Sequence, residues 1–155
     1  MKVIVLNSLS HSGSTVLSMV LSASQNAISL GEIYQILRDE PSKWLNKNES
    51  CSCGQSSEHC DFWGPVLRHI HTHQIHDINE RYQYALNYFE SHYGSDSVLI
   101  DTSKGDKHLN IYRHINVDYK LIYLLRDVRS FAFSQSKVAA RQKRKGLKKI
   151  KGKVW

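Results

Sequence analysis

Two features that are common in secreted and membrane proteins are missing from this chain of 155 residues. Its apolar run at residues 3–6 is too short for a membrane-spanning helix, which needs about 20 apolar residues. No series of basic, apolar and small residues typical of a secretory signal precedes that run. We therefore expect a cytoplasmic protein with no membrane span.

Acidic residues are also missing from residues 137–155, where nine lysines and arginines lie. The chain has a net charge of +7, but the rest of it carries 12 basic and 14 acidic residues, a net −2. We interpret this basic tail as a solvated charged surface, with contact to the phosphates of a bound nucleotide as an alternative. Nucleic-acid binding is disfavoured because no aromatic residue lies among the basic residues before Trp155.

The remaining composition, 41% hydrophobic, suits one soluble domain that is long enough to bury a core. No repeat or low-complexity linker divides it, so residues 1–155 are expected to form a single domain. Apolar strands alternate with helical patterns, which predicts a three-layer α/β/α fold with a parallel sheet. The expected strands are 2–8, 97–101 and 119–125, and the expected helices are 13–24, 31–38, 62–76, 77–93, 106–115 and 128–145.

The first strand leads into a turn of small residues, Ser8 to Thr15, and a helix opens at about Gly13. The first amides of a helix have no intrahelical acceptor and lie at its positive end, so this turn is suited to phosphate or sulfate. The lysine of the triphosphate-binding motif is missing, because Ser14 stands at its position, and this disfavours ATP or GTP hydrolysis. The alternative is a turn that binds nothing. The predicted anion-binding residues are His11, Ser12, Gly13, Ser14 and Thr15.

A basic residue follows each of two further expected strands. Arg126 comes directly after the strand at 118–125, and Lys104 ends the short segment after the strand at 97–100. Ligands of open parallel sheets collect at the carboxyl ends of the strands, so both cations are expected near the first turn.

Together these segments resemble the sulfotransferases that use 3′-phosphoadenosine 5′-phosphosulfate (PAPS). The stretch from His11 to Thr15 is similar to their loop for the 5′-phosphosulfate, [RK]-S-G-[ST]-T, with His11 in place of Arg or Lys. Arg126 and Ser134 are similar to their 3′-phosphate pair in R-[DN]-x-[RK]-x-x-x-x-S. Gly31-Glu32 and Lys104 are similar to the segments that supply a catalytic base and a catalytic lysine.

This resemblance implies a sulfotransferase fold of the P-loop type, of which the chain would be an N-terminal portion. The implied reaction transfers a sulfuryl group from PAPS, as co-substrate, to a hydroxyl or amine. Glu32 would act as the general base, and Lys104 and His11 would stabilise the leaving phosphate, with no metal required. The acceptor stays open among carbohydrate, tyrosine, lipid and small molecules.

Other interpretations stay open at this point. Glu32 can instead cap the helix that follows it, Lys104 can be a solvated loop lysine, and Arg126 can pair with Asp127 or Asp101. The alternative functions are a nucleotide or nucleoside kinase-like P-loop protein and an inactive nucleotide-binding remnant.

Three cysteines, Cys51, Cys53 and Cys60, lie in an expected loop between Pro41 and Pro65. A zinc site that includes His59, a disulfide and a reduced loop are all compatible with the spacing, and a reducing cytosol favours the reduced loop. In that loop, Phe62 and Trp63 are expected to pack into the core. The histidines at 69, 73 and 76 have helical spacing but no carboxylate partner, which disfavours a metal site there.

Overall fold

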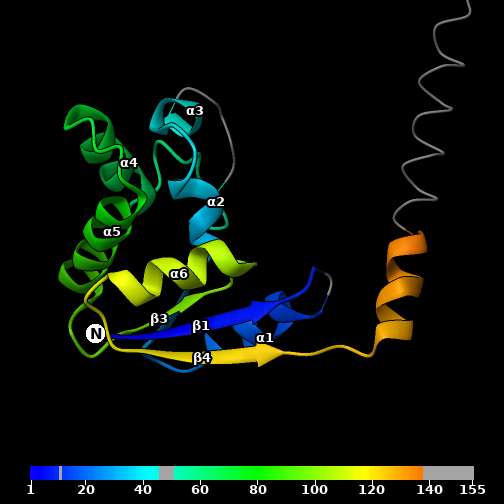
Figure 1. The fold of residues 1–155 in the computed structure, drawn as a ribbon. Helices are drawn as coiled ribbons and strands as arrows, with labels where there is room; N and C mark the ends of the chain where they lie inside the picture. The colour runs from blue at the N-terminus through cyan, green and yellow to red at the C-terminus, as the bar shows by residue number, and fades with distance from the viewer. Residues whose placement is uncertain (11, 46–50, 138–155) are drawn as a thin grey trace, which may run out of the picture.

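The computed structural model describes residues 1–10, 12–45 and 51–137. A four-stranded sheet lies at the centre, and all its neighbouring strands are parallel, in the order β2-β3-β1-β4 (Figure 1). Helices flank this sheet, which confirms the predicted α/β class with a parallel sheet. The strands are β1 (Lys2–Ser8), β2 (Ala27–Gly31), β3 (Val98–Asp101) and β4 (Tyr119–Leu124).

The order of the strands decides which face of the sheet each helix covers. The chain passes from β1 to β2 through α1 and then reverses direction, returning through α2–α5 to β3 and through α6 to β4. Right-handed connections place α1 on one face and the later helices on the other. The helices are α1 (Ser14–Leu21), α2 (Ile33–Leu37), α3 (Pro41–Leu45), α4 (Trp63–Thr72), α5 (Ile78–Tyr93) and α6 (Asp106–His114).

The main core lies between the sheet and the later helices. Val3 and Val5 on β1 are fully buried in it, together with Leu99 on β3. Phe89 on α5 is also fully buried and packs edge-on against Phe62. The apolar and aromatic spacing of the predicted helices at 62–93 therefore does produce a core-facing surface, as expected.

A buried arginine ties α5 to the segment that follows α2. Arg81 is only 4% exposed, and its guanidinium donates to the carbonyl oxygens of Leu37 (2.9 Å), Asp39 (2.9 Å) and Ile75 (2.6 Å). The fixed fork of donors on arginine matches three carbonyls in a way that lysine cannot. The end of α2 is thereby held against α5, which fixes the element that begins at the candidate site.

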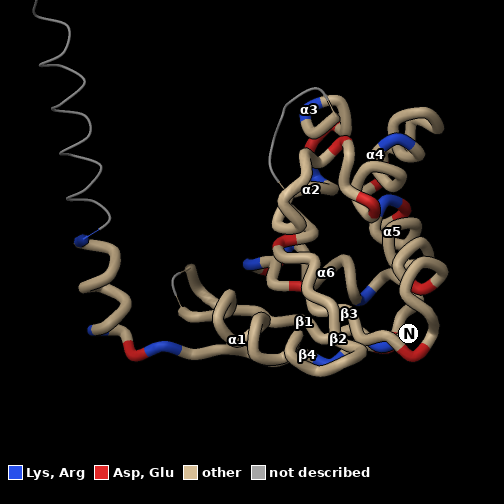
Figure 2. Tube along the Cα trace, turned by 180° about the vertical axis from the view of Figure 1, so that it is seen from behind, with Lys and Arg blue, Asp and Glu red and all other residues tan. Residues whose placement is uncertain are grey.

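Beyond β4, a helix over residues 128–137 stands apart from the rest of the molecule (Figures 1 and 2). Asp127 caps its start by accepting a hydrogen bond from Arg129 N (2.8 Å). Leu125 is 81% exposed and Phe133 is 63% exposed, so this part of the chain buries little apolar surface. The rest of the predicted helix, 138–145, and the basic tail beyond Lys137 lie outside the described residues.

Two elements were not predicted, the strand β2 and the short helix α3. Two helix boundaries also differ from the prediction. The helix expected to reach residue 76 ends at Thr72, and the helix expected from residue 31 begins at Ile33. Within the described ranges, no helix is long and apolar enough to cross a membrane. Basic and acidic residues are interspersed along the main body (Figure 2).

Candidate functional site

The turn after β1 has the geometry expected of an anion-binding loop. Gly13 occupies the N-cap of α1 with φ of 92°, a left-handed conformation that favours glycine. The first helical hydrogen bond runs from Leu17 N to Gly13 O (3.0 Å), so the preceding amides, from Ser14 to Val16, have no acceptor within the helix. The local structure predicted for this turn is confirmed, whereas its anion remains a prediction. His11 lies outside the described residues.

Two hydroxyl groups of this turn are buried without a described partner. Ser8 Oγ at the end of β1 and Ser12 Oγ in the loop are both inaccessible and make no hydrogen bond to any residue that the structure describes. A buried hydroxyl without a partner is unfavourable, and an anion with several acceptor oxygens would remove that penalty. The predicted cofactor-binding residue Ser14 is also buried, at 3% exposure.

Glu32 and Lys104 form an ion pair, which joins the ends of two neighbouring strands. Glu32 stands at the N-cap of α2, directly after β2, but its side chain makes no capping hydrogen bond. Both side chains are partly buried, Glu32 at 35% and Lys104 at 24% exposure. Glu32 thus begins the helix, as the structural alternative had it, but its side chain pairs with Lys104 and not with a helix amide.

A buried carboxylate holds the segment that carries Lys104. Asp101 is fully buried and accepts hydrogen bonds from Ser103 Oγ (2.5 Å), Ser103 N (2.8 Å) and Tyr112 OH (3.0 Å). Ser103 Oγ in turn accepts from Tyr34 N (2.9 Å) in α2. This chain of bonds connects β3 to the helix that Glu32 begins, so both members of the ion pair are positioned by the same network.

Burial acts in opposite directions on two titratable groups near this network. It raises the pKa of Asp101, although the hydrogen bonds from Ser103 oppose the shift. Burial lowers the pKa of His108, and the nearby Asp101 carboxylate opposes that shift in part. His108 is fully buried in the first turn of α6, and neither ring nitrogen makes a hydrogen bond within the described part of the chain. Sequence reasoning missed it, because a histidine in a polar helical segment gives no signal of burial.

A cavity of about 550 Å³ extends from the start of α1 to Glu32. Thr15 from the start of α1, Glu32 from the start of α2 and Thr102 from the segment after β3 all line it. Ser52 from the cysteine loop lines the same cavity. A ligand in this space would therefore touch Thr15, one of the predicted anion-binding residues, and Glu32, the predicted base.

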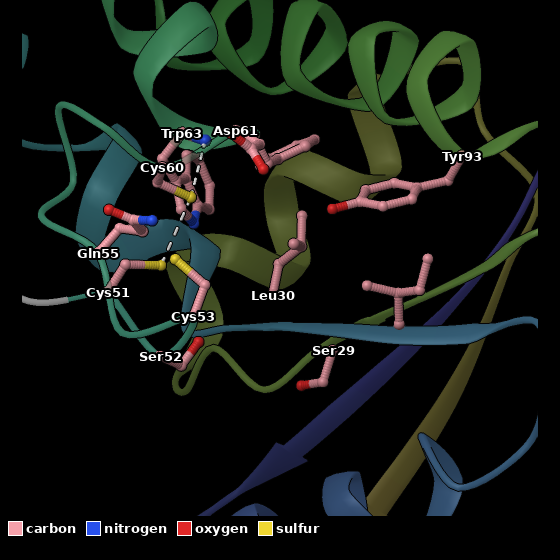
Figure 3. Close-up of a pocket in the computed structure, with 12 residues that line it drawn as sticks. Ser29, Leu30, Cys51, Ser52, Cys53, Gln55, Cys60, Asp61, Trp63 and Tyr93 are labelled. Atoms are coloured by element: carbon pink, nitrogen blue, oxygen red, sulfur yellow. Dashed lines mark hydrogen bonds between the residues drawn. The ribbon is translucent and has the colours of Figure 1, made fainter.

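Two smaller cavities adjoin the cysteine loop. One, of about 340 Å³, is lined by Glu32 and Ser52 together with Trp44, whose buried Nε1 has no hydrogen-bond partner within the described ranges. The other, of about 360 Å³, lies between the three cysteines, the β2 strand and Tyr93 (Figure 3). Ser52 lines all three cavities, so the tip of the cysteine loop is a shared wall beside Glu32.

The structure brings only some of the predicted nucleotide-binding residues together. Ser8 on β1 is level with Leu124 on β4, so Arg126 follows at the same edge of the sheet as the turn after β1. Ser134 lies on the helix over residues 128–137, which stands apart from α1 (Figure 1). Their role in binding a 3′-phosphate remains a prediction.

The acids that were considered as partners of Arg126 have other hydrogen bonds. Asp127 Oδ2 pairs with Arg129 Nη2 (2.9 Å), and these contacts lower the pKa of the Asp127 carboxyl. The other acid, Asp101, is bonded to Ser103 and Tyr112.

The histidines on α4 stack with aromatic rings. The ring centroid of His69 lies 3.8 Å from that of Tyr84 and 3.9 Å from that of His73.

The cysteine loop contains a group of side chains spaced to hold a metal ion. Among the described residues, that group consists of the three cysteines. The packing of Phe62 and Trp63 into the core, each at 3% exposure, is as predicted.

Comparison with known proteins adds no assignment. No family model matches the chain, and no curated protein or solved structure matches it significantly. Function is therefore inferred from the fold and the side chains of this site.

Proposed function

We propose that this chain is part of a PAPS-dependent sulfotransferase, which transfers a sulfuryl group to a hydroxyl or amine. The observation that carries the proposal is the ion pair of Lys104 with Glu32, a residue that lines one cavity together with Thr15. A cation and a carboxylate thus lie near the helix start to which we assign anion binding. Those are the groups that sulfuryl transfer from a nucleotide needs.

In the proposed reaction, the acceptor oxygen or nitrogen forms a bond to sulfur while the bond from sulfur to the bridging oxygen breaks. The electron pair of that bond leaves with 3′-phosphoadenosine 5′-phosphate (PAP). Glu32 takes the proton of the acceptor, a contribution of roughly 10²- to 10⁴-fold in rate. For this, donor binding must draw Lys104 away from Glu32 towards the bridging oxygen, where negative charge develops.

Binding of the donor is assigned to the groups along the carboxyl edge. The free amides at the start of α1, with Ser12, Ser14 and Thr15, would bind the 5′-phosphosulfate. His11 would add a positive charge when it is protonated. Arg126 would bind the 3′-phosphate through paired, charge-assisted hydrogen bonds, and Ser134 would join it once the helix over residues 128–137 packs closer.

The finer fold assignment, a P-loop sulfotransferase fold present in part, belongs to the same proposal. Its support is the order of strand, small-residue turn and helix at Lys2–Leu21, with the cationic segments following the neighbouring parallel strands. PAP is the co-product, and no step of the proposed mechanism uses a metal ion.

Calorimetry on the full chain with PAP tests the proposal, because PAP carries both phosphates and no reactive sulfate. We expect micromolar binding that is lost in Arg126→Ala and retained in Arg129→Ala, a matched control whose side chain is engaged with Asp127. Ser134→Ala should weaken binding, while Ser136→Ala on the same helix should not.

Two results would overturn the proposal. Tight, Mg²⁺-dependent binding of ATP without binding of PAP would indicate the kinase-like alternative. Absence of binding to any nucleotide, in a chain shown to be folded by circular dichroism, would indicate the inactive remnant.

A further inference from the structure

The sulfur atoms of Cys51, Cys53 and Cys60 form a compact group beside the candidate site (Figure 3). All three lie within 4.8 Å of one another, and Cys51 Sγ is 3.6 Å from Cys60 Sγ. All three are free cysteines, with Cys60 buried and Cys53 exposed. The cluster thus has an interior side and a side open to solvent, from which an ion can enter.

The spacing of the sulfurs fits a tetrahedral ion. A zinc–thiolate bond is about 2.3 Å long, so two thiolates on one tetrahedral zinc lie roughly 3.8 Å apart. The measured Sγ–Sγ distance of 3.6 Å between Cys51 and Cys60 is close to that edge length. An ion would therefore need only small side-chain adjustments, whereas a disulfide would use two sulfurs and leave the third without a role.

The backbone of the loop supports this arrangement. A tight turn is closed by Gly54 N to Cys51 O (2.9 Å), and Cys51 N donates to Gln55 O (2.7 Å). Trp63 N at the start of α4 donates to Cys60 Sγ at 3.4 Å. Donation of an amide to a sulfur ligand is the kind of outer contact that orients metal-binding side chains.

An acidic side chain lies beside the cluster. Asp61 lines the adjoining cavity and adds negative charge. His59 is not part of the cluster, and its Nδ1 instead bonds to Ser56 Oγ (2.8 Å).

We propose that Cys51, Cys53 and Cys60 bind one Zn²⁺ ion as three thiolates, with water from the adjoining cavity as the fourth ligand. Binding releases the three thiol protons to solvent, and no electron is transferred. Soft thiolates and tetrahedral geometry select zinc over the hard cations magnesium and calcium.

The ion would order the loop that carries Ser52. This residue lies between two of the ligands in the sequence and lines the cavities that contain Glu32. A metal at the cluster therefore fixes one wall of the candidate site without touching the transferred group. The proposal stands independently of the assigned reaction, since it depends only on the three sulfurs and their loop.

The test is metal and thiol analysis of the full chain, purified under reducing conditions without chelator. We expect one zinc per chain, which a mercurial reagent releases and added Zn²⁺ restores. Reconstitution with Co²⁺ should give the intense thiolate-to-cobalt charge-transfer and visible bands of a tetrahedral, sulfur-rich site. Cys51→Ser, Cys53→Ser and Cys60→Ser should each weaken Co²⁺ binding at least tenfold.

His59→Ala and Ser52→Ala are the matched controls, and both should bind Co²⁺ as the unaltered chain does. Loss of the metal in His59→Ala alone among these controls would overturn the three-cysteine ligand set. One free thiol instead of three in the denatured, metal-free chain would indicate a disulfide and overturn the proposal. So would failure of the unaltered, folded and fully reduced chain to take up Zn²⁺ or Co²⁺. Because these last readings use no variant, a substitution that prevents folding does not affect them.

Discussion

Lys104 Nζ is paired with Glu32 Oε1, so the two side chains predicted to carry the transfer chemistry meet at the carboxyl ends of β3 and β2. Each strand positions one of them, and Thr102 N binds Gly31 O (2.9 Å) between the two. A cation and a base held in contact must separate before either can act on a ligand. The pair is therefore expected to be a resting arrangement that donor binding opens.

The first prediction concerns this pair. Glu32→Gln should lower the rate of PAP formation from PAPS, measured with a panel of acceptors, by roughly 10²- to 10⁴-fold, because the general base is lost. Lys104→Met should also lower the rate, because the leaving phosphate loses a counter-charge. Partly exposed ion pairs contribute less than about 1 kcal/mol, so both variants should remain folded.

Lys107→Met and Glu80→Gln are the controls for these substitutions. Both side chains belong to exposed residues on α6 and α5, and each change removes one charge of the same sign. If the controls lose as much activity as the test variants, net charge rather than position is responsible. Unchanged turnover in Glu32→Gln would remove Glu32 as the base.

The second prediction concerns Gly13, which has φ of 92° at the N-cap of α1. Apart from the chain neighbours of Gly13, no described atom lies within 4 Å of the position that a Cβ would occupy, so the cost of Gly13→Ala is expected in the backbone. A left-handed residue with a side chain costs roughly 1–2 kcal/mol. We expect Gly13→Ala to lower the free energy of unfolding by about that amount and to weaken PAP binding.

Asparagine tolerates the left-handed conformation better than alanine does. Gly13→Asn should therefore lose less stability than Gly13→Ala in chemical denaturation. Equal losses in the two variants would show that φ is not the cause, and undiminished PAP affinity in Gly13→Ala would separate the turn from the binding site.

Sequence patterns identified β1, β3 and β4, because each is a short apolar run that ends in polar residues. They missed β2, although Ile28 and Leu30 pack against the core and Ser29 alternates with them. A strand of only five residues at the edge of the sheet, half-buried throughout, carries a weak periodic signal. Alternation across this segment was the clue that could have revealed it.

The candidate site was predictable in its parts but not in its assembly. Glu32 and Lys104 were each singled out by resemblance and by their positions next to expected strand or helix ends. Their contact depends on β2 lying beside β3, which is a property of the sheet order and requires the strand that was missed. Burial of Asp101 and His108 depends on how α6 packs, which local sequence does not encode.

The third prediction concerns the buried carboxyl of Asp101, whose pKa is raised by burial. The native state holds this proton more tightly than the unfolded state does. Its effect on stability is therefore most favourable below the unfolded pKa of about 3.9, and stability falls as the pH rises towards the folded pKa. Asp101→Asn should remove that decline, so unfolding free energies of the two proteins should converge or cross as the pH rises.

Asp101→Asn also changes the hydrogen bonds, because an amide nitrogen cannot accept from Tyr112 OH. Tyr112→Phe removes the same bond without removing the carboxyl, which makes it the matched control. It should lower stability by about 1–3 kcal/mol and keep the decline with rising pH, extended to a higher pH because the lost bond from Tyr112 lowers the pKa of Asp101. If both variants have the same pH profile, titration of Asp101 is not the cause.

The last prediction concerns His108, whose pKa is lowered by burial. Below the unfolded pKa of about 6.5, the unfolded state binds a proton that the native state does not. The stabilisation from this group is therefore complete above that pH and is lost as the pH falls towards the folded pKa, by up to about 1.4 kcal/mol per pH unit.

His108→Leu should flatten this part of the pH profile of the unfolding free energy, measured in denaturant titrations, since leucine does not titrate. His114→Gln, at the exposed end of the same helix, should retain the slope of the unaltered chain. Because Asp101 opposes the shift of His108, Asp101→Asn should extend the loss of stability to a lower pH while its onset stays at the unfolded pKa, and an unextended loss would show that the two groups are not coupled.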